Sequence, residues 1–223
     1  MLSVPGQKNY EYGYKFAYKI ACQQLAEVDS IEQQCLNSGA EYRIIDSHPV
    51  IIVDYLNRSY KISLPDVGIS LTDSDEDVPI KDKILLLHYL IQAKGTPTSN
   101  KSVAYKELPE GISYSPTFYK RAIKPLIDRF GRQPNRLIDA AKELGGYKAD
   151  YGDAAVTIDA FKRVPITFVL WRGDDEFPSE GGILFDANVS DYLSIEDINV
   201  LCEAVAWKLV RLLKEGSERS SGT

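Results

Sequence analysis

The chain has 223 residues, of which 44% are hydrophobic and 26% are charged, and its formal net charge is −6. These values are typical of a soluble globular protein, and the length is sufficient for one substantial core with or without a small lobe. A nucleic-acid partner requires a concentrated positive face, whereas the basic residues here are dispersed apart from Lys120, Arg121 and Lys124. We therefore expect no nucleic-acid partner.

The sequence also argues against a membrane span and against a cysteine-based site. The longest uncharged apolar runs, near 84–91 and 166–171, are too short to cross a bilayer, and the N-terminus lacks the apolar core of a secretory signal. Cys22, Cys35 and Cys202 are far apart and form no Cys-x-x-Cys pair. We expect a cytoplasmic protein without a disulfide framework, structural zinc or iron–sulfur cluster.

The N-terminal part is predicted to contain two helices followed by an antiparallel meander. Apolar spacing of three and four residues predicts a helix over 10–28, after an irregular start, and a second helix over 30–37 ends at Gly39. Turn residues at 46–48 and 57–59 separate the strands that follow. The predicted strands are 41–45, 49–56 and 60–64, and the acidic stretch 73–77 is a solvated linker.

Residues 80–94 are predicted to form a helix that begins after Pro79 and ends at Gly95. His88 falls within the apolar stripe of this helix, next to Tyr89. Two interpretations stay open for His88. It is either a hydrogen-bonded core residue or a functional residue, acting as a ligand to a metal or tetrapyrrole or as a proton carrier.

The C-terminal half alternates helices with a hairpin. A short strand is predicted over 103–107 in a loop-rich connection. Ser115-Pro116 predicts the start of a helix that runs to Phe130, with a kink at Pro125. Further helices are expected over 135–144 and from a Ser194–Asp197 capping box to about Glu215, followed by a disordered tail at 216–223.

The stretch 164–193 is predicted to organise the rest of the chain. The apolar, β-branched run 165–171 is typical of a strand buried on both faces, with 155–161 as a neighbour and 183–185 as the returning strand. The loop between them carries Asp174, Asp175 and Glu176 in succession. Such a loop is either a solvated turn or a site for a cation or a basic partner.

The order of elements is helices, meander, helices, hairpin and helix. This order predicts an α+β fold with an antiparallel sheet, built from the meander and the C-terminal hairpin, rather than a doubly wound sheet. We expect a single domain over 1–215, with a possible small N-terminal lobe over 1–75. The sequence contains no glycine-rich phosphate loop and no Gly-x-Ser-x-Gly elbow.

Four segments carry a family resemblance: ILLLHYLIQAKG at 84–95, YSPTFYKRAIKPL at 114–126, GDAAVTIDAFKRVPITFVLWRGDDEFP at 152–178 and ILFDANVSDYLSIED at 183–197. In these segments the chain resembles a widespread family of uncharacterised domains, a domain of unknown function found mainly in anaerobic bacteria and archaea. The resemblance implies a cytoplasmic, anaerobic setting in which corrinoids, haem-like tetrapyrroles and iron–sulfur enzymes are common. It implies no particular reaction.

Three functional hypotheses follow: an accessory binding protein, an enzyme, and a protein-interaction domain with exposed Tyr and Trp surfaces. The first is an accessory protein that binds a cofactor or partner, with a tetrapyrrole or corrinoid as the sharpest guess because aromatic and basic side chains would meet its ring and its carboxylate or amide groups. Its expected ligand-binding residues are His88, Tyr89, Tyr114, Arg121, Lys124, Trp171 and Phe177.

The second hypothesis is an enzyme that uses the acidic loop for acid/base chemistry or for a divalent cation. Its expected metal-binding or acid/base residues are Asp174, Asp175, Glu176 and Asp186. Binding is favoured over catalysis because no nucleophile–base arrangement is recognisable in the sequence. The oligomeric state is not indicated by any pattern.

Overall fold

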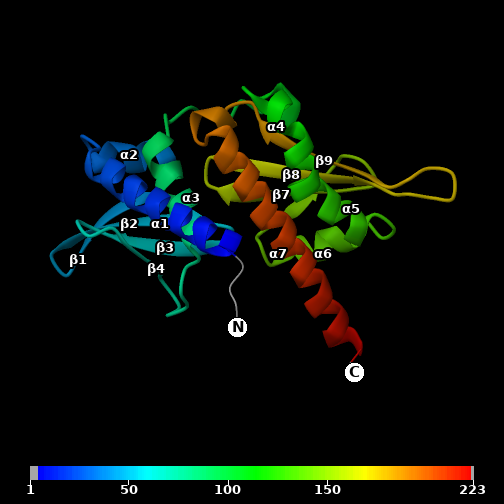
Figure 1. Ribbon diagram of the computed structural model, residues 1–223, viewed down its shortest axis with the longest axis horizontal. Coiled ribbons are helices and arrows are strands. Elements are labelled where there is room, and N and C mark those ends of the chain that lie inside the picture. The colour runs from blue at the N-terminus through cyan, green and yellow to red at the C-terminus, as the bar shows by residue number, and fades with distance from the viewer. Residues whose placement is uncertain (1–4, 222–223) are drawn as a thin grey trace. The chain divides into compact units, whose positions relative to one another are not determined.

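The computed structural model describes residues 5–221 (Figure 1). Its chain divides into two compact units, one ending at Thr96 and the other beginning at Pro97. The possible N-terminal lobe was expected to end near residue 75, ahead of helix α3 (Ile80–Gln92), whereas α3 belongs to the first unit.

In its described part, the first unit combines an antiparallel meander of strands β1 to β4 with helices α1, α2 and α3. Each strand pairs with the next along the chain, and the β1–β2 and β2–β3 turns each leave two residues between the paired ends. The bounds are α1 Pro5–Ala26, α2 Ile31–Ser38, β1 Glu41–Ile45, β2 His48–Tyr55, β3 Arg58–Ser63, β4 Gly68–Leu71 and α3 Ile80–Gln92.

Helix α2 is fixed by its caps and by hydrogen bonds to α3. The Ser30 hydroxyl accepts from Gln33 N at 3.3 Å, and Gly39 ends the helix in the left-handed region at φ 74°. The Gln34 side chain donates to the carbonyl of Ala93 at 2.8 Å, at the end of α3. The Ser30 contact satisfies a backbone N–H group at the start of α2, and the Gln34 contact satisfies a backbone carbonyl at the end of α3; a helix terminus would otherwise leave these groups without partners.

The second unit is built around strands in the order β6-β7-β8-β9-β5, with every neighbouring pair antiparallel. Helices α4 to α7 lie on one face of this sheet (Figure 1). A 3-10 turn at Tyr105–Glu107, a π-helical segment at Tyr119–Ile123 and a second 3-10 turn at Val189–Asp191 complete the unit. The bounds are β5 Ser102–Ala104, α4 Gly111–Phe118, α5 Lys124–Phe130, α6 Arg136–Lys142, β6 Tyr147–Ala149, β7 Ala154–Phe161, β8 Val164–Trp171, β9 Glu180–Asp186 and α7 Ile195–Ser221.

Strand β8 is central, as the sequence predicts. Its alternate residues Ile166, Phe168 and Leu170 are all at most 1% exposed, and β7 and β9 flank it on either side. Burial of each of these large apolar side chains under the helices contributes roughly 1.5–3 kcal/mol to the stability of the second unit. The predicted α+β class with an antiparallel sheet is confirmed.

The helix predicted to start at Ser115-Pro116 instead starts at Gly111, and Pro116 lies inside α4. A side chain at Gly111 is impossible without rearrangement because its Cβ would lie 1.9 Å from the carbonyl oxygen of Tyr105. The predicted kink at Pro125 takes the form of the π-helical segment, in which Lys124 N bonds to Tyr119 O. A wider π turn accommodates a proline that cannot donate to the preceding turn.

Other differences concern element ends and short strands. Helix α1 starts at Pro5, within the stretch expected to be irregular, and strands β4 and β6 were not predicted. The expected disordered tail overlaps α7, which runs to Ser221, and residues 222–223 lie outside the described part. Of the predicted Ser194–Asp197 capping box, the bond from Asp197 N to Ser194 Oγ is present at 3.2 Å. Within residues 5–221, no helix combines the length and apolar character needed to cross a membrane.

Candidate functional site

The acidic loop joins β8 to β9, and internal hydrogen bonds fix its shape. Asp174 accepts from the backbone N–H groups of Glu176 at 2.9 Å and Phe177 at 2.8 Å. These bonds to Phe177 and Glu176 hold the pKa of Asp174 below its ordinary value, because they stabilise the charged carboxylate. Asp174 therefore shapes the loop and is a poor general acid or base near neutral pH.

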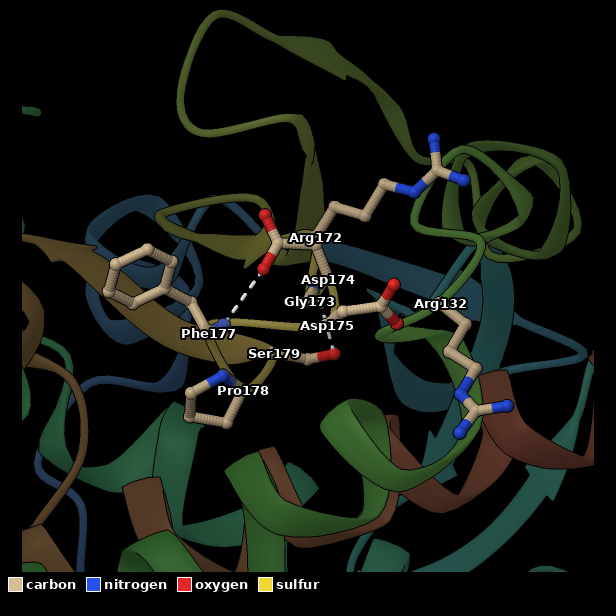
Figure 2. Close-up of a pocket in the computed structure, with 8 residues that line it drawn as sticks. All are labelled: Arg132, Arg172, Gly173, Asp174, Asp175, Phe177, Pro178 and Ser179. Atoms are coloured by element: carbon tan, nitrogen blue, oxygen red, sulfur yellow. Dashed lines mark hydrogen bonds between the residues drawn. The ribbon is translucent and has the colours of Figure 1, made fainter.

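A pocket of about 740 Å³, the hairpin pocket, lies beside this loop (Figure 2). Two of its lining residues take part in a contact between loops, in which Gly173 N donates to Ser179 Oγ at 3.1 Å and to Gly131 O at 3.3 Å. A Cβ at Gly131 or at Gly173 would each approach the Ser179 side chain to 2.5 Å. The pocket is lined by Arg132, Arg172, Gly173, Asp174, Asp175, Phe177, Pro178 and Ser179.

The two arginines give this pocket its chemical character. Arg172 follows β8 and Arg132 follows α5, and neither forms an ion pair with a carboxylate among the side chains that the structure describes. In the view of Figure 2, the Asp175 side chain extends between those of the two arginines. Unpaired guanidinium groups on two loops are suited to binding a carboxylate or phosphate.

A second, mainly apolar groove of about 670 Å³ lies along strand β9. Trp171 and Tyr119 line it while remaining 44% and 48% exposed. Exposed aromatic side chains around an apolar depression are typical of binding surfaces. The groove is lined by Ala104, Tyr105, Lys106, Ser115, Pro116, Phe118, Tyr119, Ile123, Trp171, Gly181, Gly182, Ile183 and Leu184.

The structure separates Asp186 from the other carboxylates expected at a metal site. Asp186 ends β9, whereas Asp174, Asp175 and Glu176 precede that strand. Its carboxylate accepts from Ser99 N and Oγ, Asn100 N and Asn188 N at 2.8–3.1 Å. Within residues 5–221, no group of three or more His, Cys, Asp or Glu side chains is placed to hold a metal ion.

The hydrogen bonds of Asp186 explain its ionisation. Burial by itself would raise the pKa of Asp186, but the donors from Ser99, Asn188 and Asn100 outweigh it and hold the pKa below the ordinary value. The side chain is 8% exposed. Asp186 thus anchors the segment before β5 to the end of β9.

The basic residues expected to meet a ligand are paired on the helices. Arg121 lies 3.7 Å from Glu203, and Lys124 lies 2.7 Å from Asp128 one turn along the same helix. The Tyr114 hydroxyl donates to Glu196 at 3.2 Å. None of these three side chains lines the hairpin pocket or the groove.

His88 and Tyr89 belong to the first unit, whereas Trp171 and Phe177 belong to the second. Tyr89 is fully buried, and its hydroxyl donates to the backbone carbonyl of Ser38, which is a structural role. His88 is half-buried on α3. Of the expected ligand-binding residues, Phe177 lines the pocket and Trp171 lines the groove.

Sequence reasoning missed Arg132, Arg172, Ser179 and Tyr119. Arg172 directly follows the predicted central strand, so its position next to the acidic loop was readable from the sequence. Arg132 is brought to the pocket by the contact between Gly131 and Gly173, which joins segments about forty residues apart and leaves no local pattern.

The chain belongs to the family described as a domain of unknown function (DUF3786), whose match covers residues 30–207. This range includes both units' strands, the hairpin loop and α7 as far as Trp207. Comparison with curated proteins and with solved structures gave no match.

Proposed function

We propose that this protein is a non-catalytic binding module whose ligand is a small planar molecule carrying carboxylates, of the tetrapyrrole class, held in the hairpin pocket. The observation that carries the proposal is the pair Arg132 and Arg172, which line one pocket without an ion-pair partner in the described chain. Two guanidinium groups on separate loops are suited to two carboxylates on one ligand.

The remaining lining residues support a planar, partly apolar ligand. Phe177 is 66% exposed at the pocket and offers a ring face for stacking. The Ser179 hydroxyl, held against the loop backbone by its bond from Gly173 N, is a further donor for a ligand oxygen. The pocket lining contains no His, Cys or Met that would serve as an axial ligand to a central metal. The proposed ligand is therefore held through its ring and its carboxylates, with or without a metal at its centre.

The same chemistry favours a tetrapyrrole over a corrinoid. Porphyrin-type rings carry free propionate carboxylates, whereas the peripheral side chains of cobalamin are amides. A guanidinium forms charge-assisted bonds with a carboxylate that an amide cannot match. Acid/base catalysis by Asp174 is not supported, because backbone N–H groups engage its carboxylate and favour the charged form.

Titration with haemin, followed by the shift of its visible absorption band, tests the proposal. We expect saturable binding to the wild-type protein and a loss of affinity of at least about tenfold in the double variant Arg132→Ala/Arg172→Ala. The matched control is Arg129→Ala, which removes an exposed arginine of α5 that does not line the pocket. Equal haemin affinity in the double variant and in the control would overturn the assignment.

A further inference from the structure

The outer edge of strand β9 is only partly covered. Strand β5 pairs with β9 from Ser102↔Asp186 to Ala104↔Leu184, and Tyr105 then turns away into a 3-10 turn. In the described chain, residues 180–183 of β9 therefore have β8 on one side and no strand on the other. An uncovered strand edge presents backbone N–H and C=O groups that can pair with a further strand.

The apolar groove runs along this uncovered edge and has walls on both faces of the sheet. The pairing Trp171↔Glu180 places the Trp171 side chain on the same face as Gly182, and a Cβ at Gly182 would lie 3.7 Å from its ring. Gly181 faces the opposite side, where α5 approaches so closely that a Cβ would lie 3.0 Å from Ile127. Tyr119 and Ile123 line the groove from the π-helical segment that precedes α5.

Walls on two faces fit a strand better than they fit a flat small molecule. Successive side chains of an extended peptide point to opposite faces of a sheet. A peptide added to β9 would place one set of side chains against Trp171 and the alternate set against Tyr119 and Ile123. Gly181 and Gly182 leave the edge itself without side chains that would block its approach.

The charged residues at the two ends of this edge determine which charge the bound peptide carries at each of its own ends. Lys106 lines the groove next to the end of β5, and Glu180 is exposed at the start of β9. Neither has an ion-pair partner among the described side chains. A strand antiparallel to β9, as β5 and β8 are, would run from Lys106 towards Glu180. The added strand would therefore carry an acidic residue at its N-terminal end, facing Lys106. It would carry a basic residue at its C-terminal end, facing Glu180.

We propose that the edge of β9 from Glu180 to Ile183 binds an extended segment of a partner protein as an added antiparallel strand. The segment has apolar side chains at alternate positions, an acidic residue at its N-terminal end and a basic residue at its C-terminal end. This surface shares no lining residue with the hairpin pocket and does not depend on the ligand proposed there. Main-chain hydrogen bonds supply affinity in this mode of recognition, and the side-chain walls supply specificity.

The test uses the full chain carrying Trp207→Phe, so that Trp171 is the remaining tryptophan and its fluorescence reports on the groove. The probe is the synthetic peptide acetyl-Asp-Val-Thr-Val-Thr-Lys-amide, and its charge-reversed form has Lys first and Asp last. We expect the first peptide to change Trp171 fluorescence saturably and to bind at least about fivefold more tightly than the reversed one. In the additional variant Lys106→Glu/Glu180→Lys, this preference should invert.

Alternate N-methylation of the peptide separates strand addition from unspecific apolar contact. An added strand uses the N–H groups of every second residue towards β9, while the others face solvent. Methylation of one alternate set of amides should abolish binding, and methylation of the other set should leave the affinity within about twofold. Equal effects of the two sets would overturn the proposal.

Two further readouts keep the proposal open to refutation. Tyr119→Ala should weaken the peptide by about tenfold, with unchanged circular dichroism, whereas Phe177→Ala at the other pocket should not change its affinity. Sedimentation of the protein without peptide tests the alternative occupant. If the chain forms a dimer that Tyr119→Ala dissociates, the edge pairs with a second copy and the peptide proposal is wrong.

Discussion

The two ends of strand β9 carry carboxylates of the same chemical type in opposite environments. Asp186 at its C-terminal end is 8% exposed and receives four hydrogen bonds, from Ser99 N and Oγ, Asn100 N and Asn188 N. Asp175, in the loop before its N-terminal end, is exposed and lines a pocket with two arginines. A carboxylate saturated by donors of its own chain is structural, whereas a carboxylate left without such donors beside two arginines changes the affinity of those arginines for an anionic ligand.

The largest expected effect is at the structural end. Asp186→Ala leaves the N–H groups of Ser99, Asn100 and Asn188 without their acceptor, and we expect the free energy of unfolding to fall by about 2–4 kcal/mol. Urea denaturation followed by circular dichroism measures this. Asp175→Ala is the control, with an expected change below about 0.5 kcal/mol. Similar losses in the two variants would remove the distinction between the two ends.

The pH dependence of stability sharpens the same comparison. Because the folded-state pKa of Asp186 is below its ordinary value of 3.8, its contribution is complete above that value and is lost as the pH falls through the folded-state pKa. The difference in unfolding free energy between wild type and Asp186→Ala should therefore be constant from about pH 7 to pH 5 and shrink below about pH 4. Urea titrations at a series of pH values measure this difference, and a gap that widens on acidification would contradict the sign.

A smaller and local effect is expected for the carboxylate that shapes the loop. Asp174→Ala removes the acceptor of Glu176 N and Phe177 N, so these amides should exchange with solvent faster, while the strands on either side keep their protection. Hydrogen exchange measured by mass spectrometry on peptides covering 172–179 reports this. Unchanged exchange there would show that the turn persists without Asp174.

The smallest effect is expected at Asp175. Removing its negative charge beside Arg132 and Arg172 should tighten haemin binding by about two- to fivefold, because the site is exposed and solvent screens the charge. Asp175→Asn keeps the shape of the side chain, and the absorption titration gives the affinity. Raising the salt concentration should reduce the difference between the two proteins, and a salt-independent difference would argue against an electrostatic cause.

The fold was predictable from sequence wherever burial follows a regular period. The apolar run of β8 and the stripe of α7 identify their elements because large side chains at fixed spacing must share one environment. Strands β4 and β6 were missed because they are four and three residues long and depend on pairing with a neighbour rather than on their own pattern. The start of α4 depends on the fit of Gly111 against Tyr105, which is a contact rather than a local preference.

The site was predictable only in part. The hairpin loop and its acidic residues follow from the sequence, and Phe177 and Trp171 were identified with them. The grouping of Asp186 with Asp174 ignored the length of β9, a seven-residue strand that ends at Asp186 and separates it from the loop that carries Asp174. Arg132 could not be foreseen, because a hydrogen bond between distant loops, Gly173 N to Gly131 O, brings it to the pocket.

A comparison of protoporphyrin IX with its dimethyl ester tests the role of the arginines most directly, because the two molecules share the same ring and differ in their carboxylates. Quenching of porphyrin fluorescence on titration with wild-type protein gives both affinities. If Arg132 and Arg172 hold the ligand, the free acid binds at least about tenfold more tightly than the ester, and this advantage disappears in Arg132→Ala/Arg172→Ala. Equal binding of acid and ester to the wild-type protein would contradict the account.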